Sequence, residues 1–197
     1  MADATMFGGV GMRYVALFRG VNVGTQNRVA MADLRALLDG LGLAPSQTCL
    51  QSGNAVLTAG AQPEVQLAAQ IDAAFAARFG FHGHVQLRDA PALAALVDAL
   101  PFTPEQLAQA EAADPQAEHL YVCFLSLPPQ DAQLATVQAA AQAEGDQLVV
   151  AGREIYLLTQ RSIRLSQTAI RLGRALPHAT ARNWRTVLRL TAMLREA

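Results

Sequence analysis

Lysine is absent from this chain of 197 residues, in which all fifteen basic residues are arginine. This absence excludes a Schiff-base enzyme, a catalytic lysine and the lysine-dependent phosphate loop of many nucleotide-binding proteins. Long apolar runs are also missing, since none approaches the ~20 residues of a membrane helix. The chain begins without the basic and apolar segments of a secretory signal. We therefore expect a cytoplasmic protein with no membrane partner.

Cysteine is scarce, and metal-binding residue types do not cluster. Cys49 and Cys123 lie far apart in apolar segments, which favours two buried free thiols in a reducing compartment. His82 and His84 are close in sequence, but no cysteine or group of carboxylates completes a metal shell beside them. The glycine motif of dinucleotide sites and the serine motif of many hydrolases are both missing. The sequence therefore predicts no metal and no cofactor, and it identifies no catalytic residue.

Charged residues make up only 16% of the chain, and the two signs are unevenly distributed. Residues 1–100 have six arginines and seven acidic residues. Residues 101–152 have seven acidic residues and no arginine, whereas residues 153–197 have nine arginines and two acidic residues. The acidic and basic segments either neutralise one another in the fold or leave an anion-binding surface.

The first half of the chain shows the hydrophobic periods of a βαββαβ unit, which is the ferredoxin-like order. Glycines follow the two long helical patterns, and Ser52-Gly53-Asn54 has the residue types of a hairpin turn. The expected elements are a strand at 14–18, a helix at 31–41, hairpin strands at 48–50 and 55–57, a helix from Pro63 to Gly80, a strand at 84–87 and a short helix after Asp89.

The second half repeats this order as βαββα, followed by one more helix. Its inner helix and its hairpin lie about 100 residues beyond those of the first half, so we predict a structural duplication. The expected elements are a strand at 119–125, a helix through Leu134, Val137 and Ala141, a hairpin at 148–157 that turns at Gly152-Arg153, and basic helices at about 162–172 and 182–194.

We therefore predict an α+β protein of two subdomains. The expected parts are a flexible N-terminus at 1–11, a ferredoxin-like subdomain at 12–100, a connector at 101–118 and a C-terminal α+β subdomain with basic helices at 119–197. In the last helix, Arg182, Arg185 and Arg189 are expected on one face, with Trp184 anchoring the other face in the core. Arg161, Arg164, Arg171 and Arg174 are expected to form a similar stripe on the helix before it.

Two polar segments, Arg19–Arg28 and Gln51–Asn54, interrupt the apolar pattern of the first half. In a ferredoxin-like sheet, the first strand ends at the edge where the hairpin of the second and third strands turns. Both segments should therefore meet at the N-terminus of the first helix, whose unpaired N–H groups favour an anion. The predicted ligand-binding residues are Arg19, Gly20, Asn22, Gly24, Asn27, Arg28, Gln51, Ser52 and Asn54, with Arg182, Asn183 and Trp184 from the last helix.

The predicted ligand is a small anion, such as a nucleotide or a phosphorylated metabolite. The planar guanidinium group of Arg28 has five N–H donors that can bind such an anion. Glycine and asparagine are also ordinary loop residues, so a structural or protein-interaction module is an alternative. Nucleic-acid binding by the C-terminal arginines is a second alternative. Base stacking on the first strand is disfavoured, because Tyr14 and Phe18 are expected on opposite faces. No feature of the sequence predicts an oligomeric state or names a reaction.

Four short motifs resemble a bacterial family catalogued as domain of unknown function 1697. The shared patterns are Arg-Gly-x-Asn-Val-Gly at 19–24, Met-x-x-Leu-Arg at 31–35 after the basic Arg28, Thr-x-x-Gln-Ser-Gly-Asn at 48–54 and Thr-x-Arg-Asn-Trp-x-Thr-Val at 180–187. The resemblance spans about residues 12–194. Cys49 stands where the family usually has an aromatic residue, and Arg28 and Arg164 stand where lysine is common. The resemblance implies a two-subdomain α+β fold and brings no established activity, substrate or catalytic residue.

Overall fold

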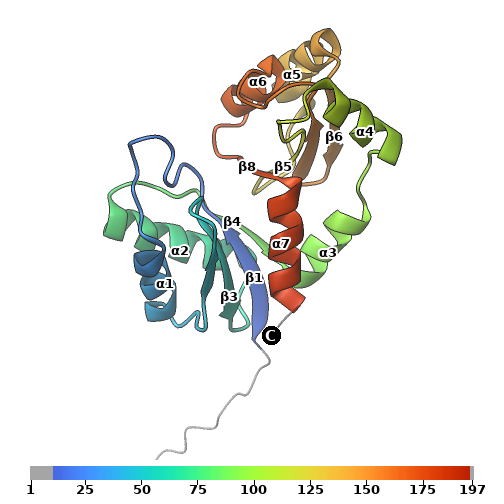
Figure 1. The fold of residues 1–197 in the computed structure, drawn as a ribbon. Coiled ribbons are helices and arrows are strands. Elements are labelled where there is room, and N and C mark those ends of the chain that lie inside the picture. Colours follow the sequence, from blue (N-terminus) through green and yellow to red (C-terminus); the bar gives the residue numbers. More distant parts are fainter. Residues whose placement is uncertain (1–10, 196–197) are drawn as a thin grey trace, which may run out of the picture. The chain divides into compact units, whose positions relative to one another are not determined.

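The computed structural model describes residues 11–195, which fold as two compact units divided between Ala90 and Pro91. Figure 1 shows the course of the chain through both units. Of the N-terminal segment expected to be flexible, residues 1–10 lie outside the described part. No helix within residues 11–195 is long and apolar enough to cross a membrane.

The first unit has the predicted βαββαβ order. Its four strands form one antiparallel sheet in the order β2-β3-β1-β4, which confirms the ferredoxin-like plan. The elements are β1 (Met12–Leu17), α1 (Met31–Gly40), β2 (Gln47–Cys49), β3 (Asn54–Ala59), α2 (Glu64–Phe79) and β4 (Gln86–Asp89). The last strand begins two residues later than predicted, because His84 has a left-handed φ of 42° that a strand does not accommodate.

Strand alternation and helix periodicity build the core of this unit on the sheet face that α1 and α2 cover. Tyr14, Ala16 and Phe18 point to this face, where the Phe18 ring stacks on Phe75 of α2 with 4.9 Å between centroids. The expectation that Tyr14 and Phe18 lie on opposite faces is therefore wrong, since residues four apart on a strand share a face. Both are buried, so neither offers a stacking surface to a base.

The second unit contains a second four-stranded antiparallel sheet, in the order β6-β7-β5-β8. Its hairpin turns at Gly152-Arg153 as predicted, with Gly152 at a φ of 61°. Its elements are α3 (Ala90–Asp98), α4 (Pro104–Ala113), β5 (Leu120–Phe124), α5 (Asp131–Glu144), β6 (Gln147–Ala151), β7 (Glu154–Leu158), α6 (Gln167–Ala175), β8 (Thr180–Asn183) and α7 (Trp184–Arg195). The predicted two-subdomain α+β class is confirmed.

Strand β8 is the element that the sequence interpretation lacked. The last helix was expected from residue 182, but Thr180–Asn183 pairs with β5, and α7 begins at Trp184. The Asn183 side chain accepts a hydrogen bond of 3.0 Å from the Thr186 N–H group, which starts the helix there. Arg182 is consequently in a strand and shares no helix face with Arg185 and Arg189. The preceding helix also starts later than expected, because Ser166 caps it by accepting from the Ala169 N–H group.

With β8, each unit is a complete βαββαβ fold with the same strand order, so the predicted duplication is present in the structure. The fourth strand of each unit, β4 in the first and β8 in the second, contains a buried arginine. Arg88 lies opposite Val15, and Arg182 lies opposite Val122. Each guanidinium donates to the carbonyl of the residue before it, Leu87 or Ala181. Burial lowers the pKa of Arg182 to about 10.

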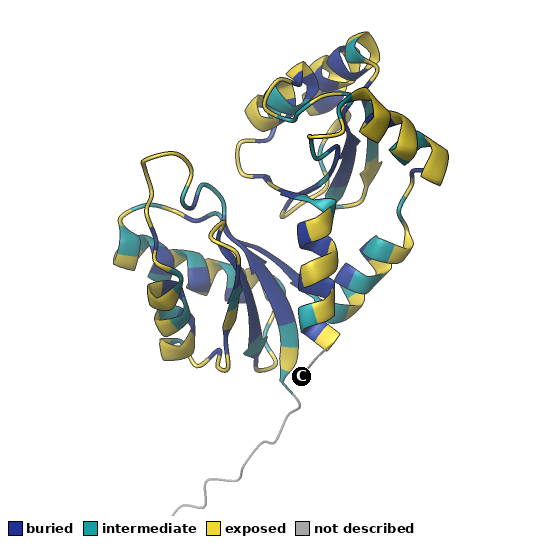
Figure 2. Cartoon of the chain, viewed as in Figure 1, coloured by how far each residue is buried: buried dark blue, intermediate teal, exposed yellow. Residues whose placement is uncertain are grey.

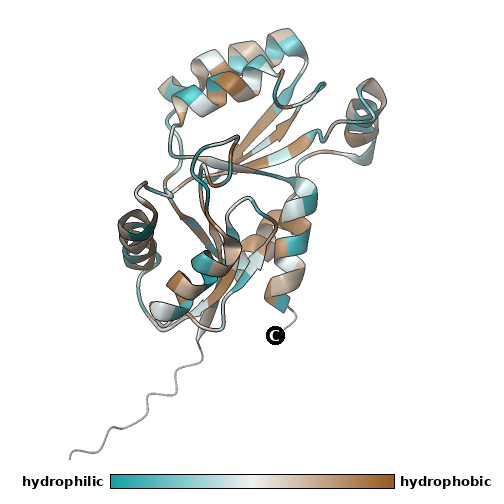
Figure 3. Cartoon of the chain, turned by 60° about the vertical axis from the view of Figure 1, so that its left-hand side comes forward, coloured by the Kyte–Doolittle hydropathy of each residue, from teal (hydrophilic) through white to brown (hydrophobic). Residues whose placement is uncertain are grey.

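Burial and hydropathy follow the two-layer plan within each unit. In the second unit, Leu134 and Val137 of α5 and Leu172 of α6 pack on Cys123, Ile155 and Leu157 of the sheet. Figures 2 and 3 show the strands as mostly buried and apolar, whereas the outer faces of the helices are exposed and more polar. Cys49 and Cys123 are buried free thiols, as predicted.

Candidate functional site

The loop from Arg19 to Ala30 leaves the central strand β1 and reaches the N-terminus of α1. Four of its residues have a left-handed φ, namely Gly20, Asn22, Gly24 and Asn27. Asn22 closes the loop on itself: its side chain donates to the Val29 carbonyl and accepts from the Val29 N–H group, both at 2.9 Å. The Asn22 N–H group also donates to the Asn27 carbonyl at 3.0 Å. These bonds fix the base of the loop. The tip of the loop takes part in none of them.

The β2–β3 hairpin meets this loop at the same edge of the sheet, as the ferredoxin-like strand order predicts. The Asn22 side-chain amide donates to the Gln51 carbonyl at 2.7 Å, and the Phe18 N–H group donates to the Gly53 carbonyl at 2.8 Å. Gly53 packs so closely that an added Cβ would lie 2.9 Å from the Cβ of Val21. The structure therefore brings the two polar segments together.

The predicted site residues differ in what they present to solvent. Asn54 is fully buried, and its amide donates to the Cys49 carbonyl at 3.0 Å and to the Ser52 hydroxyl at 2.9 Å. Arg19 and Gly20 are partly exposed. The exposed members are Gly24, Asn27, Arg28, Gln51 and Ser52. Figure 2 shows this loop as an exposed projection from the first unit. Asn22 and Asn54 thus hold the backbone of the loop and the hairpin in place, and the exposed residues form the surface that faces solvent.

Arg28 and the start of α1 provide positive charge on this surface. Across residues 11–195, the Arg28 side chain forms neither a hydrogen bond nor an ion pair. Ala30 occupies the N-cap position of α1 and has no side-chain acceptor to offer. The first helical bond runs from the Leu34 N–H group to the Ala30 carbonyl, so the three N–H groups before it have no partner inside the helix. One opposing charge is present, since Asp33 lies in the first turn of α1.

The α2–β4 loop is a third part of this edge, and the sequence interpretation did not include it in the site. The Arg19 N–H group donates to the Gly83 carbonyl at 2.6 Å. Gly83 allows this approach because an added Cβ would lie 2.7 Å from the Phe18 ring. The signal that could have found this loop was topological: β4 runs antiparallel to β1, so β4 begins where β1 ends.

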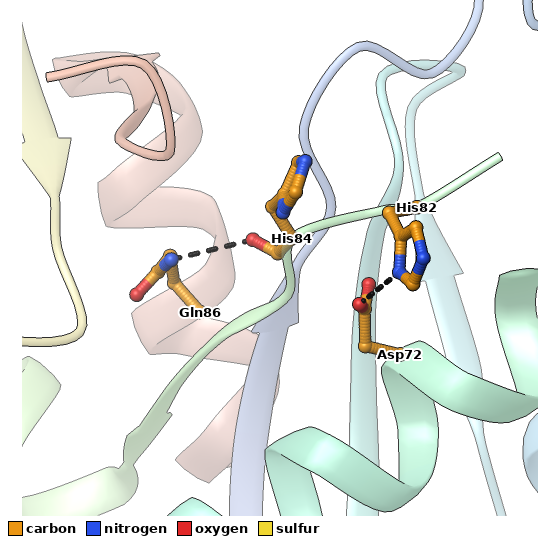
Figure 4. Close-up of polar contacts among 4 residues, drawn as sticks. All are labelled: Asp72, His82, His84 and Gln86. Carbon is orange, nitrogen blue, oxygen red and sulfur yellow. Dashed lines mark hydrogen bonds and ion pairs between the residues drawn. The ribbon is translucent and has the colours of Figure 1, made fainter.

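Two histidines flank Gly83 on this loop. Figure 4 shows His82 directed toward Asp72 of α2, with 2.7 Å between the His82 Nδ1 atom and Asp72 Oδ2. The second Asp72 oxygen is buried and has no hydrogen-bond partner in the described part of the chain. The His82 and His84 rings stack with 5.9 Å between centroids, and the His84 carbonyl accepts from the Gln86 amide at 3.3 Å. The Asp72 carboxylate can therefore orient the His82 imidazole.

A metal centre is not indicated on this edge. The described residues contain no group of three or more histidine, cysteine or carboxylate side chains placed to hold a metal ion. The His82 and Asp72 pair alone provides two ligands, fewer than the three or four protein ligands of a zinc site.

The predicted residues Arg182, Asn183 and Trp184 belong to the second unit. Arg182 is buried and donates to the Thr180 hydroxyl at 2.7 Å, while Asn183 caps α7. Trp184 is only partly buried, although the sequence interpretation made it a core anchor. It lines an open cavity of about 400 Å³ between α4 and α7, together with Leu107, Leu120, Leu158 and Leu188.

The family model described as "Protein of unknown function (DUF1697)" matches residues 12–156. The chain belongs to the DUF1697 family. The matched residues include the whole first unit from β1 and the second unit as far as β7, so they include the candidate loop, the hairpin and the α2–β4 loop. The fourth sequence motif, at 180–187, lies beyond the matched residues.

A solved structure resembles this chain over nearly its whole length. It is that of the conserved bacterial protein SP0830 from Streptococcus pneumoniae, which is 26% identical to this chain. The match covers 93% of this chain and 99% of SP0830, with a TM-score of 0.65. No curated protein matches the chain. These comparisons establish the family and the fold of this DUF1697 protein, and they name no ligand.

Proposed function

We propose that this DUF1697 protein binds a small anionic ligand, a nucleotide or a phosphorylated metabolite, at the N-terminus of α1. The observation that carries the proposal is an uncapped helix start preceded by an exposed arginine that has no partner among residues 11–195. Unpaired N–H groups at a helix N-terminus and the positive end of its dipole favour an anion there. The Arg28 guanidinium adds charge and a fork of donors that matches a phosphate.

The framework around Arg28 supports ligand binding by limiting the conformations of the loop. Asn22 holds the base of the loop to Val29 and to the hairpin, so a ligand would order few additional backbone torsions. The exposed side chains of Gln51 and Ser52 offer polar groups for the remainder of the ligand. Arg19, Gly20, Gly24 and Asn27 complete the proposed loop surface. The assignment of Arg182, Asn183 and Trp184 to the same site stays a prediction.

Asp33 is the feature that opposes an anion at this position. Its carboxylate lies in the first turn of α1, and the Arg78 guanidinium approaches it to only 3.9 Å. Both side chains are more than half exposed, so solvent screens this ion pair strongly. Asp33→Asn should therefore strengthen the binding of an anion at the helix start, and Arg28→Ala should weaken it.

A thermal-shift screen of nucleotides and phosphorylated metabolites tests the proposal. One charge-assisted hydrogen bond contributes about 1.5–3 kcal/mol, so Arg28→Ala should weaken binding about ten- to a hundredfold. Arg171→Ala is the matched control, because it removes another exposed arginine that has no partner within residues 11–195, and does so in the second unit. The proposal fails if no compound stabilises the wild type, or if the two variants lose affinity equally.

A further inference from the structure

Four exposed arginines lie close together in the sequence of the second unit, between the end of β7 and the end of α6. They are Arg161, Arg164, Arg171 and Arg174, which we call the arginine cluster. None of the four side chains forms a hydrogen bond or an ion pair with any residue that the structure describes. Four like charges within fourteen residues make this segment strongly basic, which favours the binding of an external anion.

Two carboxylates that bond to this segment accept from its backbone and from a serine, not from its arginines. Glu144, at the end of α5, accepts from the N–H groups of Gln167 and Thr168 at 2.7 and 3.3 Å. Asp146 is buried and accepts from the Gln160 N–H group and the Ser166 hydroxyl, both at 2.8 Å. Both acids thus hold the start of α6 in place, and none of these four bonds involves a guanidinium. These two carboxylates therefore do not neutralise the arginines of the basic segment, which was one of the two alternatives that the sequence left open.

The same bonds fix the backbone that carries the arginine cluster. Ser162 accepts backbone bonds from Leu165 and Ser166, which forms a helical turn before α6. Within α6, Thr168 and Leu172 are buried, whereas Arg171 and Arg174 are exposed three residues apart. Side chains at this spacing have Cβ atoms about 5–6 Å apart on one helix face. Burial and the charge of Glu118 raise the pKa of Tyr121, and the charge of Arg164 opposes this rise.

We propose that the arginine cluster binds the phosphate backbone of a nucleic acid, without reading its sequence. Guanidinium groups pair with phosphates through charge-assisted bonds that are independent of the base. An anionic membrane fits the cluster less well, because a surface-lying helix needs an exposed apolar face and the apolar Leu172 of α6 is buried. Among the residues around the cluster, Leu165 is the one large aliphatic side chain that is largely exposed in the described structure.

The salt dependence of binding tests this proposal with the full-length chain. The probes are a labelled single-stranded RNA and a single-stranded DNA, each of twenty nucleotides. Four phosphate contacts should lower the affinity about 50-fold between 50 and 200 mM salt. For Arg171→Gln/Arg174→Gln, which leaves two contacts, this loss should be only about sevenfold. Since both residues are exposed, circular dichroism and thermal melting should show a folded variant.

The matched control is Arg78→Gln/Arg195→Gln, which removes two exposed charges that belong neither to the arginine cluster nor to the proposed ligand site. It should keep the wild-type salt dependence, and inorganic phosphate at equal ionic strength should not displace the probes. The proposal is overturned if neither probe binds at 50 mM salt, if both double variants show the wild-type salt dependence, or if only anionic lipid vesicles bind. Because the small-ligand screen depends on Arg28 and this titration depends on Arg171 and Arg174, the two proposals can fail separately.

Discussion

The side-chain amide of Asn22 lies 2.7 Å from the backbone carbonyl of Gln51 and joins two segments that are 29 residues apart in the chain. The same side chain makes two further bonds to Val29. A loop residue whose three bonds are all to backbone groups specifies the path of the chain. Asn22 therefore determines how the candidate ligand surface is presented, even though its own amide is already bonded.

Replacement of Asn22 should measure the strength of this connection. Asn22→Gly keeps the left-handed φ of 55° but removes all three side-chain bonds, so we expect a loss of about 1–3 kcal/mol in the free energy of unfolding. Asn22→Ala should cost about 1 kcal/mol more, because alanine is strained at positive φ. Urea denaturation of both variants gives these values. Equal stability of the wild type and Asn22→Gly would show that the bonds contribute nothing to stability.

Gly53 should tolerate alanine much less well than Gly152 does. Both glycines have a left-handed φ, 69° and 61°, and both lie in hairpin turns. An added Cβ at Gly53 would lie 2.9 and 3.0 Å from the Cβ atoms of Val21 and Phe18, whereas at Gly152 it would meet nothing within 4 Å. Gly152→Ala should therefore cost about 1 kcal/mol from backbone strain alone, and Gly53→Ala about 2–4 kcal/mol.

Thermal or urea unfolding of the two glycine variants, measured under one condition, provides the comparison. The difference between them isolates the close contact of the hairpin with the loop, since the backbone term is common to both. Similar losses for the two variants would mean that the hairpin shifts to relieve the contact.

Tyr156 should make stability depend on pH in the alkaline range. Its side chain is buried, and its hydroxyl donates to the Leu96 carbonyl at 2.7 Å. Burial and the neighbouring Glu154 raise the pKa of Tyr156 from 10.0 to about 12. The folded state therefore retains this proton more strongly than the unfolded state, so the stabilisation is complete below pH 10 and is lost as the pH rises through 12.

Two pKa units correspond to about 3 kcal/mol, which is the largest loss to expect from this residue. Tyr156→Phe should cost about 1 kcal/mol at neutral pH, because one hydrogen bond is removed, and should flatten the stability profile between pH 10 and 12. Denaturant titrations at several pH values compare the variant with the wild type. Since burial also raises the pKa values of Tyr14 and Tyr121, Tyr14→Phe is a suitable control for the general tyrosine effect.

Short-range patterns in the sequence were sufficient to predict most of this fold. A continuous apolar run at 14–18 located β1, and the Ser52-Gly53-Asn54 turn located the hairpin. Ferredoxin-like topology then placed Gln51 beside the β1–α1 loop. The same patterns did not predict strand β8, because Thr180–Asn183 contains an arginine and an asparagine, which are rare in buried strands. Arg182 is buried by tertiary structure, and no local pattern encodes that burial.

The candidate site was predictable only where its residues were polar and followed an apolar run. His82 and His84 were noticed for their spacing, but the strand was placed over His84, whose left-handed φ ends any strand there. Their position on the site edge depends on Gly83, which admits the Phe18 ring, and on the bond from the Arg19 N–H group. Such close approaches depend on side chains far apart in the sequence, so local patterns do not show them.

The bond between His82 and Asp72 should fix which ring nitrogen carries the proton in the neutral imidazole. A carboxylate only accepts hydrogen bonds, so Nδ1 must be the donor and the Nε2 lone pair must face away from Asp72. In Asp72→Asn the amide can donate to Nδ1, which should shift the neutral ring toward the Nε2–H form. Long-range ¹⁵N–¹H NMR spectra above pH 8 distinguish the two tautomers. Stability should change by less than about 1 kcal/mol, because the His82 side chain is 63% exposed. An Nε2–H tautomer in the wild type would show that Asp72 does not orient this ring.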